Sequence, residues 1–154
     1  MNQTPMLNQI KTSLEKEYYK VILNFEELNG ARYEQLIVSI IFQDHPQIPD
    51  LKLYIMFLPG VEKELDGVSV LQYYIAYTTS VKNDDHVASL KSRANELNKT
   101  LAIGHFGFNE FDNSIFIKYT QTIFDQYDAS TEKCVIMIVN ALTFQLSSQF
   151  GQFV

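Results

Sequence analysis

The chain contains very little cysteine, since Cys134 is the single thiol among 154 residues. One thiol cannot form an internal disulfide or supply the several thiolates of a structural metal site. Stability must therefore come from an apolar core, and a hydrophobic fraction of 46% is enough for one domain of this length. A lone thiol is also compatible with a reducing compartment, so we expect a cytoplasmic protein.

Clusters of positive charge are missing as well. The 12 Lys and Arg residues are scattered singly among 18 Asp and Glu residues, and the net charge is −6. Contact with a phosphate backbone or an anionic membrane surface depends on a basic patch. We therefore expect neither a nucleic acid nor a membrane as a partner. The start of the chain also lacks the basic and apolar regions of a secretory signal.

Uninterrupted apolar runs are short, and the longest apolar segment lies at the end of the sequence. No side chain from Cys134 to Val154 is charged, but Asn140 and Gln145 are among the polar residues that interrupt this segment. A membrane-spanning helix needs about 20 largely apolar residues. Three interpretations remain open: a membrane anchor, a helix enclosed by its own domain, and a helix with one face on a sheet and the other at an interface.

Three segments show the features of helices. Apolar residues recur at helical spacing over about 4–17 and 84–98, and an apolar helix is predicted over about 130–150. N-cap residues precede or begin these segments at Thr4, Asn83 and Asp128.

Six other segments alternate with a period of two and are predicted to be strands. Asn29-Gly30 is a strong hairpin signal between the first two strands, and a loop is expected over residues 61–68. The strands are predicted over 19–26, 36–43, 51–58 and 70–79, with a fifth beginning at Ile103 and His105 and a sixth over 115–119.

The order of these segments is α-β-β-β-β-α-β-β-α. It predicts a single α+β domain over residues 1–154 with a mainly antiparallel sheet and helices at the N-terminus, middle and C-terminus. Both faces of the predicted strands are apolar. Such a sheet requires cover on both sides, from helices or from another subunit.

The residues that could carry chemistry do not form a known motif. His45, His86 and His105 lack the spacing of metal ligands, and the acidic residues near His86 are typical of a helix start. Cys134 is expected to be buried in an apolar helix, where a thiol is inert. We therefore predict no catalytic, metal-binding or cofactor-binding residue. A pocket near His105 and Tyr119, serving a small molecule or a small enzyme, is an alternative.

The order of elements resembles the type III secretion chaperone fold and the YbjN-like family of bacterial proteins. The resemblance extends from the first helix to the last and is carried mainly by the second half: Val87–Leu97, Leu101–Phe106, Asp112-Asn113, Ser114–Tyr119 and Val135–Leu146. The strand at Val70–Thr79 is additional to the three-strand meander of the secretion chaperones, which favours the YbjN-like branch. The resemblance implies a bacterial homodimer that holds other proteins without a cofactor or catalysis.

These observations predict a non-catalytic protein-binding module, either chaperone-like or a regulatory adaptor. An inhibitor or immunity-type protein, whose acidic face blocks a basic enzyme, is an alternative. The predicted dimer interface consists of Val135, Ile138, Leu142 and Leu146. The predicted partner surface consists of Tyr54, Tyr74 and Phe106.

Overall fold

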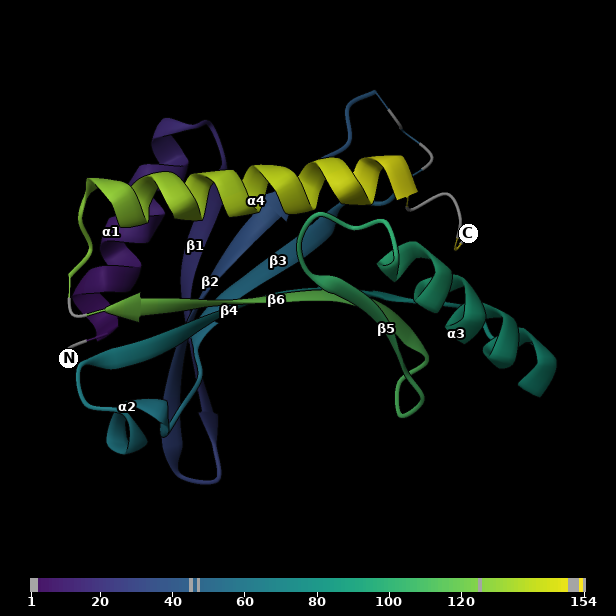
Figure 1. The fold of residues 1–154 in the computed structure, drawn as a ribbon, viewed down its shortest axis with the longest axis horizontal. Coiled ribbons are helices and arrows are strands. Elements are labelled where there is room, and N and C mark those ends of the chain that lie inside the picture. The colour runs from purple at the N-terminus through teal and green to yellow at the C-terminus, as the bar shows by residue number, and fades with distance from the viewer. Residues whose placement is uncertain (1–2, 45, 47, 125, 150–152, 154) are drawn as a thin grey trace.

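The strands form one antiparallel sheet in the order β1-β2-β3-β4-β6-β5 (Figure 1). The structure is a computed structural model that describes residues 3–44, 46, 48–124, 126–149 and 153. The predicted α+β class and order of elements are confirmed, and His45 lies outside the described residues. The elements are α1 (Gln3–Lys16), β1 (Lys20–Leu28), β2 (Ala31–Ile40), β3 (Leu51–Phe57), α2 (Val61–Glu64), β4 (Val68–Thr78), α3 (Asp84–Asn98), β5 (His105–Asn109), β6 (Ser114–Phe124) and α4 (Ala129–Gln149).

Caps and turns explain where several elements begin or end. Asn29 and Gly30 have φ values of 52° and 76°, which suit the tight turn of the β1–β2 hairpin. The Asn83 side chain accepts a hydrogen bond from the His86 amide at 2.9 Å and caps α3. At the start of α4, the Asp128 carboxylate accepts a hydrogen bond from the Thr131 amide at 2.8 Å.

Two local predictions were wrong. The segment expected to be a loop contains the single-turn helix α2. Thr4 is not an N-cap, because α1 already includes Gln3. The Thr4 hydroxyl instead donates a hydrogen bond to the Glu34 carboxylate of β2 at 2.5 Å. The first turn of α1 is thereby tied to the sheet.

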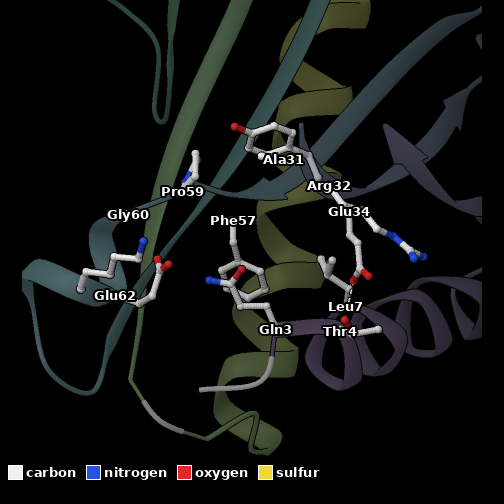
Figure 2. A pocket seen from close by; sticks show the side chains of 12 residues that line it. Gln3, Thr4, Leu7, Ala31, Arg32, Glu34, Phe57, Pro59, Gly60 and Glu62 are labelled. Atoms are coloured by element: carbon white, nitrogen blue, oxygen red, sulfur yellow. Dashed lines mark hydrogen bonds between the residues drawn. The ribbon is translucent and has the colours of Figure 1, made fainter. Parts of the chain in front are cut away.

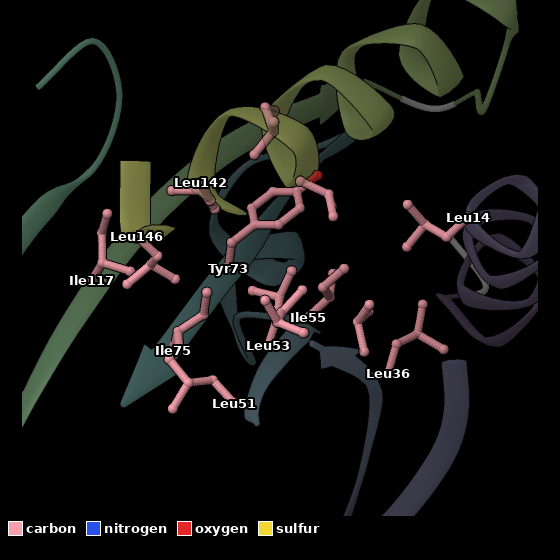
Figure 3. Close-up of a cluster of buried hydrophobic side chains, with 14 of the residues drawn as sticks. Leu14, Leu36, Leu51, Leu53, Ile55, Tyr73, Ile75, Ile117, Leu142 and Leu146 are labelled. Carbon is pink, nitrogen blue, oxygen red and sulfur yellow. The ribbon is translucent and has the colours of Figure 1, made fainter. Parts of the chain in front are cut away.

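The core lies on one face of the sheet, which we call the covered face. Figure 1 shows α1 and α4 together on this side, with α3 beside β5. Figure 3 shows apolar side chains of the central strands meeting those of the two helices. Residues of this cluster that are at most 2% exposed include Leu7, Leu14, Leu36, Leu53, Ile55, Tyr73, Ile75, Ile117 and Leu142.

The final helix packs on the covered face along one of its sides. Its buried side chains are Val135, Ile138, Val139, Leu142, Gln145 and Leu146. Gln145 accepts hydrogen bonds from the Ala102 and Ile103 amides and donates one to the Ile103 carbonyl at 2.9 Å. Of the described helices, none combines the length and the apolarity that a bilayer crossing requires.

Candidate functional site

The other face of the sheet, which we call the open face, is covered by neither α1 nor α4. Strand register places one residue from each strand in a continuous row across it, in the order Ile22, Ile37, Tyr54, Tyr74, Lys118 and His105. The sequence predicted cover on both faces. Within the described residues, the long helices α1 and α4 both pack on the same side, which leaves this row in contact with solvent.

An aromatic cluster forms the centre of the open face. The rings of Tyr74 and Phe116 stack with centroids 5.5 Å apart, and His105 meets Phe116 edge-on at 6.1 Å. Phe116 lies over Gly107, the paired residue of β5, because a Cβ there would come within 2.8 Å of the ring Cε2. Burial raises the pKa of the Tyr74 hydroxyl, and the nearby Asp112 carboxylate raises it further.

Aliphatic side chains extend this cluster toward β1. Ile22 is 54% exposed, while Ile37 and Met56 are partly exposed beside Tyr54. These side chains continue the apolar surface from β6 through β3 to the edge strand β1. Large contiguous apolar surfaces are uncommon on monomeric proteins, so the open face is the candidate interaction surface.

The structure separates the three residues of the predicted partner surface. Tyr54 and Tyr74 are direct neighbours on the open face. Phe106 lies on the covered face, where it is 3% exposed and its ring centroid is 5.1 Å from that of Phe153. A partner-binding role for Phe106 does not fit this burial, because the ring is already part of the core.

The residues of the predicted dimer interface also lie in the core. Val135, Ile138, Leu142 and Leu146 are at most 8% exposed and face the sheet of their own chain. They are therefore not available to a second subunit. The outward side of α4 instead presents the exposed residues Cys134, Met137 and Phe144. The expectation that Cys134 is buried was wrong, since its side chain is on this outward side.

No shared pocket joins His105 and Tyr119. His105 pairs with Lys118 and lies on the open face, so Tyr119 points to the opposite face. There its ring centroid is 6.2 Å from that of Tyr73 in the core. Among the described residues, no group of three His, Cys, Asp or Glu side chains could hold a metal ion.

A cavity of about 710 Å³ lies where α1, β2, β3 and α2 meet (Figure 2). Leu7 and Phe57 provide its apolar lining, and the figure shows Phe57 between the carboxylates of Glu34 and Glu62. Glu62 Oε2 is buried and has no hydrogen-bond partner among the described residues. The size of the cavity suits a small ligand. The Glu62 carboxylate oxygen could accept a hydrogen bond from a donor group of that ligand.

Neither a family model nor a curated protein matches this chain. The function must therefore follow from the geometry of the molecule itself. Sequence patterns identified Tyr54 and Tyr74 as surface candidates but did not identify Phe116. Gly107 is paired with Phe116, and a glycine opposite an aromatic residue is the signal that could have identified Phe116. That signal becomes visible only once the pairing of β5 with β6 is known.

Proposed function

We propose that this protein is a non-catalytic protein-binding module, chaperone-like or a regulatory adaptor, that acts as a homodimer in the cytoplasm. The observation that carries the proposal is the open face of the sheet, where aromatic and aliphatic side chains meet solvent. Leaving such a surface in water costs free energy that a bound partner would recover. The order of elements, which resembles that of YbjN-like proteins and type III secretion chaperones, supports the same proposal.

Two kinds of contact would hold a partner. The rings of Tyr54, Tyr74 and Phe116 would bury apolar side chains of the partner, since aromatic residues contribute strongly to interfaces. In addition, β1 is an edge strand, so the main-chain groups on its outer side have no partner strand in the described sheet. An extended segment of the partner could add to the sheet there, next to Ile22.

Selection from a displayed library of random peptides tests the proposal. We expect the wild-type protein to enrich peptides rich in apolar residues. The variant Tyr74→Ser with Phe116→Ser should lose this enrichment. The matched control is Tyr18→Ser with Phe111→Ser, which also removes one Tyr and one Phe, both at least 98% exposed in turns.

The control pair should retain the enriched peptides. Melting temperatures of both double variants establish that each is folded before selection. If the wild type enriches no peptide over a scrambled library, the protein-binding proposal is wrong. If both variants lose binding equally, the open face is not the binding surface.

The cavity at Phe57 favours a second candidate function, the binding of a small amine. A protonated amine would satisfy the unpaired Glu62 Oε2 while its carbon atoms contact Leu7 and Phe57. A thermal-shift screen with primary amines of different chain lengths tests this candidate. Stabilisation by an amine that is lost in Glu62→Gln would support it, and the absence of any shift across the screen would count against it.

A further inference from the structure

We propose that the open face selects a segment of its protein partner that is both apolar and acidic. This inference rests on the protein-binding function proposed above and adds the chemistry of the partner. The charge of the open face differs from that of the whole chain. The whole chain carries a net charge of −6, whereas the strand residues of the open face carry Lys20, Lys52 and Lys118 against the single carboxylate of Glu26.

Strand register places the three lysines on the open face at separate strands from β1 to β6. Lys20 and Lys52 both pair with Ser39 of β2, so they lie in one row, two strands or roughly 10 Å apart. Lys118 lies in the next row, directly between Tyr74 and His105. The ammonium groups therefore border the apolar centre and would meet carboxylates that flank an apolar side chain of the partner.

The carboxylates near this surface lie toward its ends. Glu26 pairs with Tyr33, two rows beyond the row of Tyr54 and Tyr74. Asp112 lies in the turn between β5 and β6, where it accepts hydrogen bonds from the amide and hydroxyl of Ser114. The rows of the open face that hold Tyr54, Tyr74 and Phe116 therefore carry Lys20, Lys52 and Lys118 and no carboxylate.

The chemistry favours a protein segment over a nucleic acid. The open face carries no arginine in its strands, and arginine is the side chain best suited to paired hydrogen bonds with a phosphate group. The aliphatic side chains of Ile22, Ile37 and Met56 continue the aromatic cluster and suit aliphatic side chains better than nucleotides. The contact of these lysines with carboxylates of the partner should weaken as salt is added.

Three labelled probes test the inference by fluorescence anisotropy. The first is a short peptide that alternates Glu with Phe and Leu, the second has Lys in place of every Glu, and the third is a single-stranded oligothymidylate. We expect the acidic peptide to bind most tightly and its affinity to fall as salt is added. Equal or tighter binding of the basic peptide or of the oligothymidylate, or no binding of any probe, would overturn the inference.

Charge reversal locates the effect on the open face. Lys52→Glu with Lys118→Glu should weaken binding of the acidic peptide by about 10-fold or more at low salt. The matched control, Lys16→Glu with Lys133→Glu, changes the net charge equally, but its residues are exposed on α1 and α4. An equal loss in the control pair would show a general charge effect and overturn the inference.

Both double variants are first checked by thermal unfolding, and Lys52→Gln with Lys118→Gln replaces the reversal pair if that pair is unfolded. The peptide selection described above separates this inference from the function on which it rests. Enriched apolar peptides without a preference for Asp or Glu would overturn the acidic specificity and leave the protein-binding function supported. Failure to enrich any peptide would overturn both.

Discussion

Tyr73 is a fully buried side chain of the core, and its hydroxyl donates a hydrogen bond to the Gln121 side chain at 2.7 Å. Burial, followed by the effect of Tyr127 and Tyr119, raises the pKa of Tyr73 well above its usual value near 10. The folded state therefore keeps Tyr73 protonated at a pH where the unfolded chain loses the proton. Its stabilising effect is complete below about pH 10 and is lost as the pH rises from there toward the folded-state pKa.

The variant Tyr73→Phe tests this assignment. At neutral pH it should lower the free energy of unfolding by about 1 kcal/mol, because the hydrogen bond to Gln121 is lost. Above about pH 10 its stability should fall less steeply than that of the wild type. Urea unfolding across this pH range measures both effects. Tyr18→Phe, at a residue 98% exposed, is the control and should follow the wild type.

Gly107 cannot carry a side chain without a shift of its neighbours, because the Phe116 ring occupies the space that a Cβ would need. Gly107→Ala should displace the ring and destabilise the fold by about 1–3 kcal/mol. It should also weaken peptide binding by disturbing the stack of Phe116 with Tyr74. Phe116→Ala should relieve the overlap, so the two substitutions together should cost less than the sum of the single changes. Additive costs would contradict this packing.

At the scale of elements, the two edges of the sheet differ. The edge strand β5 is closed by α3, because the Asn98 side chain donates to the Phe106 carbonyl at 2.8 Å and accepts from the Phe106 amide at 2.6 Å. Asn98 therefore forms the pair of hydrogen bonds that a neighbouring strand would form. Closed edges resist unwanted pairing between molecules. At the opposite edge, β1 packs against α1 and has no strand on its outer side in the described sheet, which favours β1 as the place for strand addition.

Asn98→Ala should expose the edge of β5. We expect a loss of about 1–3 kcal/mol in the free energy of unfolding, because two buried backbone groups lose their partners. Amide hydrogen exchange should become faster at Phe106, and aggregation should increase on storage. Asn95→Ala, at an exposed position of the same helix, is the control. Equal losses from the two substitutions would show that the strand edge is not the cause.

At the scale of the whole molecule, the proposed homodimer requires a surface that its own core does not use. The outward side of α4 offers Met137 and Phe144, which are 63% and 72% exposed, together with Cys134. Large apolar side chains on one helical face are suited to pairing with the same face of a second copy. The interface that we propose therefore uses these residues and not the buried side of the helix.

Light scattering measures the solution mass and tests this interface. The wild type should have the mass of a dimer, and Met137→Asp with Phe144→Asp should yield a folded monomer, because paired carboxylates would be buried at the interface. Ile138→Asp, inside the core, should unfold the chain and so serves as a contrast. A monomeric wild type would remove the homodimer from the proposal and leave the partner surface to be tested alone.

The sequence by itself determined the elements of this protein, because helices, strands, caps and tight turns depend on neighbouring residues. The helix over 84–98 and the hairpin at Asn29-Gly30 follow from spacing and turn chemistry alone. Period-two patterns also placed Tyr54 and Tyr74 on strand faces. The patterns did not show which face the helices would cover. Both faces of the strands are apolar, so the alternation is the same whichever face is covered.

Only the tertiary structure decided which face received α1 and α4, and therefore which residues are exposed. The pairing of β6 with both β4 and β5 put Phe106 in the core and Phe116 on the surface. The order of all six strands also placed Lys20, Lys52 and Lys118, far apart in the chain, on the same open face as the aromatic cluster. Such a surface results from long-range strand order and from the side on which the helices pack, and neither is encoded in any local pattern.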